Sequence, residues 1–231
     1  MSEASLGDTW VVVPLYNEAT VITSVIEDLK MVFDKIVVVD DKSTDDGLFL
    51  LQSMPGIWIL QHSVNLGQGA AIQTGIDYAL SRNAKAIVTF DSDGQHRVED
   101  AKAMALKLYS EGLDVVLGSR FLGVNSKTMP AAKRILLRFA TVFERTVSGL
   151  NLTDAHNGLR VFSAEAAKEL NLRQNRMAHA SEITKKIAKA KLTFREVPVE
   201  IIYTDYTRAK GQRMSNSFNI IYELLSGSFL R

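Results

Sequence analysis

The sequence of 231 residues contains no cysteine, which excludes disulfide bridges, thiolate zinc sites and cysteine nucleophiles. It has no run near the roughly 18 to 20 apolar residues that a membrane-spanning helix needs. Residues 1–9 are too polar for a signal peptide. We therefore expect a protein that is neither exported by that route nor integral to a membrane. Cytoplasmic localisation is the expectation, and peripheral association with the inner face of the membrane is compatible with it.

Internal repeats, low-complexity tracts and recognisable linkers are also missing from the sequence. The composition, with 46% hydrophobic and 23% charged residues, is typical of a chain that buries a core. Because α/β architectures commonly exceed roughly 200 residues as one unit, we expect a single domain over residues 1–231.

A net charge of only +1 conceals an uneven distribution along the chain. Residues 1–128 carry 17 acidic and 10 basic side chains, a balance of −7, whereas residues 129–231 carry 9 acidic and 17 basic ones, a balance of +8. The basic half suggests a surface for anions such as phosphate or lipid headgroups, and the acidic half is better suited to a metal ion. Solvated helix faces are the alternative explanation.

Short runs rich in valine and isoleucine alternate with segments in which apolar residues recur every three or four positions. The runs are typical of buried parallel strands, and the segments between them of helices. Their repetition predicts an α/β fold with a doubly wound, mostly parallel sheet flanked by helices, in which ligands bind at the carboxyl ends of the strands. The expected strands are Val11–Pro14, Ile36–Asp40, Ile57–Leu60, Ala86–Asp91, Val115–Gly118 and Phe194–Tyr203, and the expected helices are Glu18–Val32, Gly67–Ser81, Val98–Ser110, about 129–149 and from about 216 onward.

The fourth expected strand ends in the residues TFDSDGQH, 89–96. Asp91 and Asp93 lie two positions apart, so both carboxylates can face one pocket, and Gln95 adds a neutral oxygen at the next alternate position. Two carboxylates with coordination positions left for phosphate oxygens and water suit Mg²⁺ or Mn²⁺. For this short motif by itself, an ordinary turn is the alternative.

Four more polar residues, Asn17, Glu18, Asp40 and Asp41, follow the first two expected strands at the same edge of the sheet. A carboxylate there can accept a hydrogen bond from a base or a ribose. Alternatively, Asn17 caps a helix and residues 40–45 form a turn before another helix, and capping is compatible with ligand binding. Capping does not explain why so many acids converge, which favours a ligand site.

The segment NLGQGAA, residues 65–71, follows the third expected strand and places two glycines at the start of a helix. Backbone at glycine can approach a ligand closely, and free N–H groups at a helix start can meet an anion. The alternative is a simple start of a helix. A dinucleotide-binding motif would have a third glycine where this chain has Ile72, and it would follow the first strand, so the nicotinamide-cofactor interpretation is rejected.

These motifs, in this order, resemble the nucleotide-sugar half of family 2 glycosyltransferases with the GT-A fold. Two distal motifs are similar to acceptor-side segments of polyprenyl-phosphate and dolichyl-phosphate sugar synthases. The resemblance spans residues 9–215 and implies a nucleotide-sugar half at about 9–120 and an acceptor half at about 121–231. The motifs are VVVPLYNE (11–18), VVVDDKSTD (37–45), NLGQGAA (65–71), TFDSDGQH (89–96), GSRF (118–121), DAHNGLRVF (154–162) and YTDYTRAKGQRMS (203–215).

The resemblance implies an inverting transfer of a hexose from a nucleotide sugar, UDP-linked in preference to GDP-linked, with Mg²⁺ or Mn²⁺ on the diphosphate. Catalytic roles then fall to Asp93, Asp154 and Arg120, the last in the sugar-phosphate region. The divalent ion would be held by Asp91, Asp93 and Gln95. The residues expected to border the nucleotide sugar are Pro14, Tyr16, Glu18, Asp40, Asp41, Asn65, Gly69, Asp91 and Ser92.

The acceptor decides whether a general base is needed. The second pKa of a phosphate monoester is about 6, so a lipid phosphate is mostly dianionic at neutral pH and needs cations that position it rather than a base. Arg160, Arg208, Lys210 and Arg213 would supply these cations. With a hydroxyl acceptor, such as a glycan in cell-surface polysaccharide synthesis, Asp154 would be the candidate base.

A membrane surface or a small membrane protein is an expected partner, because the second half is basic and residues 217–231 are apolar along nearly their whole length. Packing on the core is the alternative for that last segment. No nucleic-acid partner is expected, and the sequence is compatible with a homo-oligomer.

A sugar nucleotidyltransferase would need a glycine-rich triphosphate loop where this chain has Leu15 to Glu18. A non-catalytic nucleotide-binding protein would not need the metal acids and the distal basic motif together.

Overall fold

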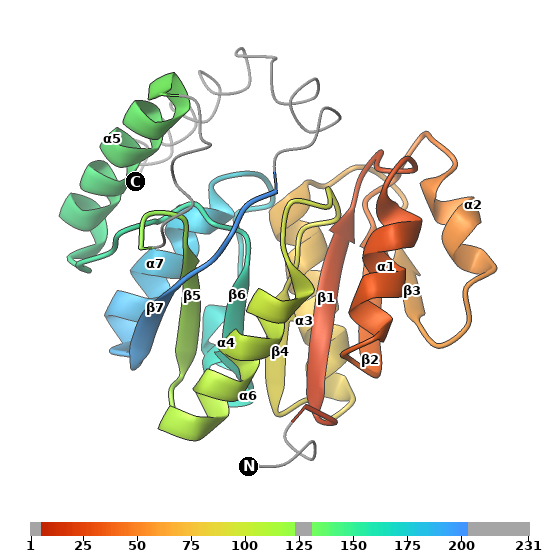
Figure 1. The fold of residues 1–231 in the computed structure, drawn as a ribbon, viewed down its shortest axis with the longest axis horizontal. Helices are drawn as coiled ribbons and strands as arrows, with labels where there is room; N and C mark the ends of the chain where they lie inside the picture. Colours follow the sequence, from red (N-terminus) through yellow and green to blue (C-terminus); the bar gives the residue numbers. More distant parts are fainter. Residues whose placement is uncertain (1–5, 123–130, 203–231) are drawn as a thin grey trace.

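A computed structural model describes residues 6–122 and 131–202, with side chains except at 131–133. In this part of the chain, seven strands form one sheet in the order β3-β2-β1-β4-β6-β5-β7, flanked by helices (Figure 1). The strands are β1 (Thr9–Leu15), β2 (Lys35–Asp40), β3 (Trp58–Gln61), β4 (Ala86–Thr89), β5 (Val115–Ser119), β6 (Arg160–Ser163) and β7 (Phe194–Pro198). The helices are α1 (Ile22–Lys30), α2 (Gly47–Gln52), α3 (Gln68–Ser81), α4 (Val98–Glu111), α5 (Ala131–Ser148), α6 (Ala164–Leu170) and α7 (His179–Ala190).

The sheet is parallel except at β6. β1 pairs in parallel with β2 and β4, β2 with β3, and β5 with β7, whereas β6 runs antiparallel to both β4 and β5. The prediction of an α/β fold with a doubly wound, mostly parallel sheet is confirmed. β6 was not among the expected strands, because its four residues begin with an arginine and are too few to show a clear pattern. Its register places Arg160 beside Thr89, at the end of β4.

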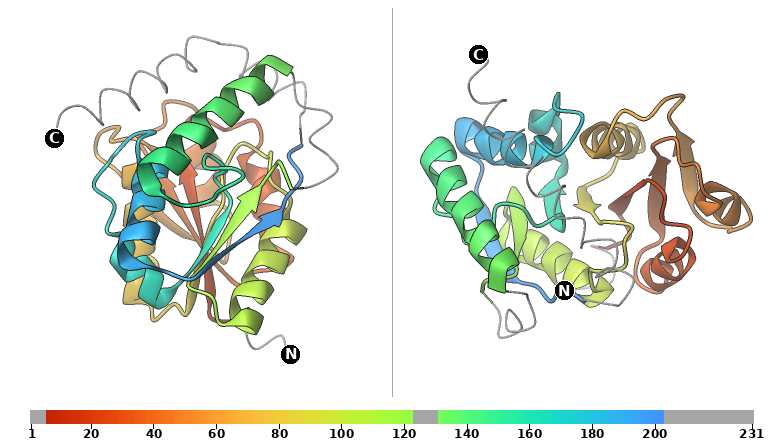
Figure 2. Two further views of the ribbon diagram at one scale, coloured as in Figure 1. Left: turned by 90° about the vertical axis from the view of Figure 1, so that its left-hand side faces the viewer. Right: turned by 90° about the horizontal axis from the view of Figure 1, so that it is seen from above.

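Alternation along β1 divides the core between the two faces of the sheet. Val11, Val13 and Leu15 pack with residues of α1 and α4, whereas Trp10 and Val12 pack with residues of α3, α6 and α7. All five side chains are at most 2% exposed. Figure 2 shows the helices on either side of the sheet in the view from above. A strand covered on both faces is a continuous apolar run, which explains why the sequence identifies β1 and β2.

Some boundaries differ from those expected. α1 begins at Ile22 rather than Glu18, because the chain turns after β1 and Asn17 adopts a left-handed conformation with φ 55°. Asn17 therefore does not cap α1, and its side-chain oxygen accepts the backbone N–H of Thr44 at 2.8 Å instead. β7 ends at Pro198, earlier than the expected Tyr203, and the helix considered after the turn at residues 40–45 is present as the short helix α2.

No helix among the described residues is long and apolar enough to cross a membrane. The expected last helix, from about residue 216, and the basic motif at 203–215 lie outside the described residues. The assignment of residues 1–231 to a single domain stays a prediction.

Candidate active site

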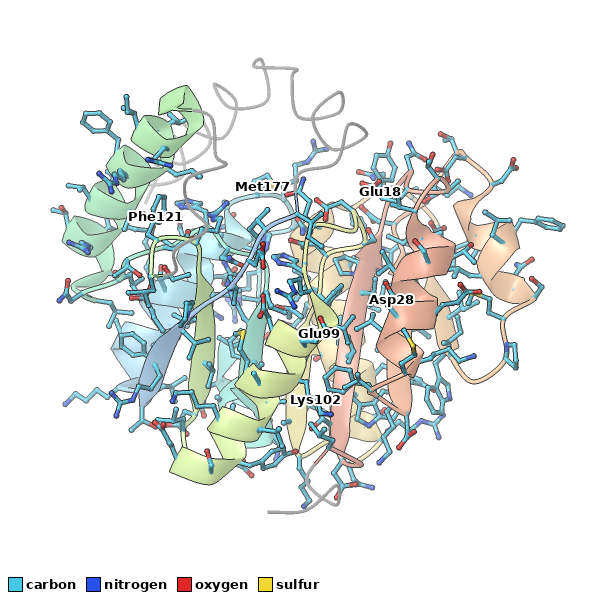
Figure 3. All side chains as sticks on the ribbon, in the orientation of Figure 1. Glu18, Asp28, Glu99, Lys102, Phe121 and Met177 are labelled. Carbon is cyan, nitrogen blue, oxygen red and sulfur yellow. The ribbon has the colours of Figure 1, made fainter. Side chains whose placement is uncertain are left out.

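Polar residues that follow the parallel strands gather at one edge of the sheet. β1, β2 and β4 are neighbours that run in the same direction, and Glu18, Asp40 and Asp91 lie at or just beyond their carboxyl ends. Figure 3 places Glu18 at the upper end of the molecule, with Met177 and Phe121 along the same end. The candidate site is built on this edge.

Asp91 is held on three sides. Its Oδ1 accepts a hydrogen bond from Gln68 Nε2 at 2.8 Å, and its Oδ2 lies 3.1 Å from His96 Nε2. Gly158 approaches so closely that a β-carbon there would be 2.0 Å from Asp91 Oδ2. Burial by itself would raise the pKa of Asp91, but the hydrogen bond from His96 and the nearby charges of His96 and Arg160 hold that pKa below its usual range. Asp91 is therefore an ionised carboxylate with a fixed orientation.

The pKa of Asp93 is shifted in the opposite direction from that of Asp91. Burial and the neighbouring charge of Asp91 raise the pKa of Asp93 to about 6. Its Oδ1 accepts the backbone N–H of Gln95 at 3.0 Å. Two carboxylates that repel each other at neutral pH form a place where a bound cation would be stabilising.

The residues present fit a hard divalent cation. Asp91, Asp93 and the amide oxygen of Gln95 offer only oxygen ligands, which Mg²⁺ and Mn²⁺ prefer. Among the described residues, no group of three or more histidine, aspartate or glutamate side chains is arranged to hold a metal by itself. Magnesium is commonly held by one or two carboxylates together with phosphate oxygens and water. These residues would therefore hold a cation jointly with a diphosphate.

A bidentate ion pair joins Arg120, just after β5, to Asp154. Arg120 Nε donates to Asp154 Oδ2 at 2.6 Å, and Nη2 donates to Oδ1 at 2.7 Å. The side chain of Asp154 is only 1% exposed. Burial would raise the pKa of Asp154, but the charge and hydrogen bonds of Arg120 hold that pKa below its usual range. A carboxylate in this state is a poor proton acceptor, so the geometry disfavours the general-base role considered for Asp154.

Glu196 on β7 fixes the segment that carries Asp154. Its carboxylate accepts the backbone N–H of Thr153 at 2.7 Å and that of Asp154 at 3.0 Å. Thr153 Oγ1 also lies 2.7 Å from Ser119 Oγ at the end of β5. The ion pair is therefore supported from two neighbouring strands.

Arg160 begins β6 and is 4% exposed. Burial lowers the pKa of Arg160 to about 10, while the charges of Asp91 and Asp154 act in the opposite direction. Its Nη2 lies 3.4 Å from the carbonyl oxygen of Ala155. Arg160 is thus a buried cation that interacts with both carboxylates, and its predicted contact with the acceptor phosphate stays a prediction.

The loop before β6 contains buried polar atoms without hydrogen-bond partners among the described residues. They are both ring nitrogens of His156 and Nδ2 of Asn157. Burial lowers the pKa of His156 to about 4, so its imidazole is neutral at pH 7. Each unpaired buried polar group lowers the stability of the fold by about 1 to 3 kcal/mol. Such a group calls for an explanation, of which a functional role is one.

Asp41, which was expected to border the nucleotide sugar, organises the loop after β3. Its Oδ1 accepts the backbone N–H of Leu66 at 2.8 Å, and its Oδ2 accepts that of Gly67 at 2.7 Å. Its carbonyl oxygen accepts from Asn65 Nδ2 at 3.0 Å. Asp41 and Asn65 therefore have structural partners in the protein, and any contact with a nucleotide stays a prediction.

The other residues expected at the nucleotide differ in exposure. Tyr16 is 47% exposed, whereas Glu18, Asp40 and Ser92 are 8%, 0% and 6% exposed. Pro14 is buried within β1. Of this group, Tyr16 is the side chain whose ring is available for a base to contact.

The glycine motif packs against another part of the chain. A β-carbon at Gly69 would be 2.1 Å from the carbonyl oxygen of Gln174, and one at Gly67 would be 2.5 Å from that of Asn175. Gly67 also has a φ of 103°, which favours glycine. Both glycines therefore allow another part of the chain to approach this turn closely. The expected contact of Gly69 with the nucleotide sugar stays a prediction.

Three residues that position the site were not predicted: Gln68, His96 and Glu196. Gln68 and His96 lie inside motifs that the sequence singles out, but their bonds to Asp91 depend on tertiary packing. Glu196 is 42 residues from Asp154 and carries no local signal. The predicted acceptor-side cations Arg208, Lys210 and Arg213 lie outside the described residues.

Comparison with known sequences gives a family and named relatives. The model of glycosyl transferase family 2 matches residues 10–170. A UDP-N-acetylglucosamine–dolichyl-phosphate N-acetylglucosaminyltransferase of Methanococcus voltae is 31% identical over 236 residues, which cover 94% of this chain and 94% of that protein. A polyprenol monophosphomannose synthase of Mycolicibacterium smegmatis is 26% identical over 172 residues, covering 71% of this chain and 64% of that protein.

Comparison with solved structures supports the same fold. Glucosyl-3-phosphoglycerate synthase from Mycobacterium tuberculosis, crystallised with Mn²⁺, UDP and glucosyl-3-phosphoglycerate, matches with a TM-score of 0.66 and 18% identity. The match covers 98% of this chain and 84% of that one. The GT-A fold expected from the sequence is therefore confirmed.

Proposed function

The chain belongs to glycosyl transferase family 2 and is a nucleotide-sugar glycosyltransferase, and we propose that it moves a hexose from a UDP-linked sugar to a polyprenyl or dolichyl phosphate. The named relatives in Methanococcus voltae and Mycolicibacterium smegmatis support a lipid-phosphate acceptor. UDP in the crystals of the structural neighbour, and in the name of the archaeal relative, supports a uridine nucleotide.

In the proposed reaction, an oxygen of the acceptor phosphate bonds to the anomeric carbon from the face opposite the nucleotide. The bond between that carbon and the β-phosphate oxygen breaks, and UDP leaves with the electron pair. The configuration at the anomeric carbon is thereby inverted. Asp91, Asp93 and Gln95 would hold a divalent cation that supplies charge neutralisation at the leaving diphosphate. Mn²⁺ and Mg²⁺ in crystals of the structural neighbour with UDP are consistent with this donor set.

The ion pair between Arg120 and Asp154 is the observation that carries the choice of a phosphate acceptor. A hydroxyl must lose its proton in the transition state, and Asp154 was the candidate to take it. In the structure, that carboxylate accepts from two guanidinium nitrogens at 2.6 and 2.7 Å and is 1% exposed. A dianionic phosphate needs no base, so this arrangement fits a lipid phosphate better than a hydroxyl.

The last described residues lie beside the proposed cation site. Ile202, directly before the basic motif in the sequence, donates its backbone N–H to the carbonyl oxygen of Gln95 at 2.9 Å. Ile201 forms an isolated bridge with His96, and Arg97 pairs with Glu200 at 2.7 Å. The described chain therefore ends beside the proposed cation site, at the residue that precedes the basic motif in the sequence. This supports an acceptor phosphate next to the donor diphosphate.

The outer face of α5 supports contact with a membrane surface. Ile135, Phe139 and Val142 follow one another at helical spacing and are 57%, 72% and 58% exposed. Arg138 and Arg145 are exposed on the same helix. An apolar face flanked by cations is complementary to an anionic lipid surface, in which a polyprenyl phosphate would be held.

The proposal is tested by incubating the purified protein with radiolabelled UDP-N-acetylglucosamine, UDP-glucose or GDP-mannose and a polyprenyl phosphate in Mn²⁺ or Mg²⁺. We expect label from a UDP-sugar to pass into the organic phase as a product that mild acid cleaves. The matched control is the corresponding polyprenol without phosphate, which should accept nothing. Transfer to free glycans or proteins, with no lipid product from any donor, would contradict the proposal in favour of a hydroxyl acceptor.

A further inference from the structure

We propose that Gln68 is a positioning residue for the divalent-cation site, acting through the hydrogen bond from its side-chain amide to Asp91. This inference rests on the proposed function. Gln68 is the first residue of α3, and its Nε2 lies 2.8 Å from Asp91 Oδ1 in the loop after β4. The contact joins the loop after β3 to the proposed cation site.

The backbone around Gln68 is fixed from two directions. On one side, the carboxylate of Asp41 accepts the backbone N–H groups of Leu66 and Gly67. On the other, the carbonyl oxygen of Asn175 accepts the N–H of Ala70 at 3.2 Å. With both flanks held, the direction in which the Gln68 side chain leaves the backbone is set by the fold.

The flanking glycines make this placement possible. A β-carbon at Gly67 or Gly69 would collide with the carbonyl oxygens of Asn175 or Gln174. The crossing segment can therefore lie against this turn only because both neighbours of Gln68 lack side chains. The side chain of Gln68, between these glycines, reaches Asp91. The motif NLGQG thus holds the backbone so that the Gln68 amide reaches Asp91.

An amide donor is suited to this task. A carboxylate has about four lone-pair sites, and one hydrogen bond to each oxygen of Asp91, from Gln68 and from His96, leaves the others available to a cation. Gln68 carries no charge, so it selects one orientation of the carboxylate without neutralising it. Without this bond, the carboxylate would lose one of its two side-chain anchors and rotate more freely before a cation binds.

The test compares Mn²⁺ binding by the full-length protein and by Gln68→Met, in saturating UDP, from the electron paramagnetic resonance signal of free Mn²⁺. Methionine keeps the length of the side chain and removes the donor. We expect the dissociation constant for Mn²⁺ to rise about tenfold. This is near the lower end of the effect expected when a hydrogen bond to a charged group is lost. Gln68→Asn, whose amide is one methylene too short to reach Asp91, should behave in the same way.

Gln52→Met is the matched control, because Gln52 is exposed at the end of α2 and the substitution is identical. In enzyme assays, the Gln68 variants should show a raised KM for the metal–nucleotide complex and an unchanged KM for the lipid phosphate. Mn²⁺ affinity within about twofold of the unsubstituted protein in both folded variants would overturn the inference and leave the proposed function standing. If the unsubstituted protein bound no Mn²⁺ with either UDP or GDP, the proposed function would fail and this inference with it.

Discussion

Arg120 and Asp154 come from segments that follow β5 and precede β6, and their side chains meet in two parallel hydrogen bonds of 2.6 and 2.7 Å. The pair is largely removed from water, with the two side chains 12% and 1% exposed. Each charge therefore depends on the other for compensation. Asp154, which was the candidate base only for a hydroxyl acceptor, instead binds the guanidinium of Arg120.

Breaking this pair should cost more stability than removing it. We expect Arg120→Gln and Asp154→Asn each to lower the free energy of unfolding by about 3 to 5 kcal/mol, because each leaves a buried charge uncompensated. The double variant should lose clearly less than the sum of the two. Chemical denaturation of the four proteins gives the coupling directly. Additive losses would mean that the two groups do not stabilise each other.

The substitution Asp154→Asn also distinguishes a phosphate acceptor from a hydroxyl acceptor. If Asp154 acts only by holding Arg120, Asp154→Asn should keep the pH dependence of transfer seen in the unsubstituted protein, measured as initial rates of lipid-product formation. If Asp154 were a general base, the substitution would instead lower the rate of transfer by about 10²- to 10⁴-fold. In that case the remaining rate would also lose its dependence on an ionised group, and a hydroxyl acceptor would become the better assignment.

Asp93→Asn should abolish transfer and yet stabilise the metal-free protein above pH 6. The pKa of Asp93 is raised to about 6, so its ionisation costs the folded state free energy as pH rises from about 4 to about 6, and that cost persists at higher pH. Asparagine removes the cost. We expect a gain on the order of 1 to 2 kcal/mol at pH 7.5 and none at pH 4, measured by denaturation in a chelator. If the variant and the unsubstituted protein were equally stable at both pH values, ionisation of Asp93 would cost the folded state no free energy.

Mn²⁺ binding in the presence of UDP should weaken in acid. Because a proton on Asp93 competes with the cation, affinity should fall by up to about tenfold for each pH unit below 6 and level off above it. Calorimetric titration without acceptor measures this separately from protonation of the lipid phosphate. The variant Asp93→Asn should lack the dependence. An affinity that does not change between pH 5 and pH 7 would contradict the prediction.

Phe139→Ser should weaken binding to anionic vesicles, and Phe49→Ser should not. The two side chains are 72% and 73% exposed, but Phe139 lies on α5 and Phe49 on α2, at opposite ends of the molecule in Figure 1. Binding of the unsubstituted protein should also weaken as salt rises, because charges act over only about 8 Å at physiological ionic strength. Vesicle flotation measures both effects. Equal losses in the two variants would remove α5 as the specific contact.

The parts of the fold that were predictable from the sequence are those with local signals. β1, β2 and β4 are apolar runs because both of their faces are covered, and α3 and α4 were located to within one residue at each end from their apolar spacing. β6 was missed because a four-residue strand that begins with Arg160 has no such signal. Its position depends on pairing with β4 and β5, which no local pattern encodes.

In the candidate site too, the residues that could be predicted are those with a local signal in the sequence. Asp91 and Asp93 were identified because they follow a recognisable strand two positions apart. The roles of Gln68 and Glu196 could not be identified, because each acts through a hydrogen bond to a residue 23 or more positions away. The glycines of the NLGQG motif were identified as special, but their packing against residues 174–176 could not be identified, because that segment is about 100 residues away in the sequence.

The antiparallel strand between β4 and β5 has a consequence for how the protein is made. β4 pairs on one side with β1, but its other edge pairs with β6, where Ala86 lies opposite Ser163. During synthesis, that edge has no partner until the chain has emerged from the ribosome through Ser163. Residues 9–120 therefore cannot complete this part of the sheet by themselves, and the nascent chain exposes an apolar strand edge until β6 emerges.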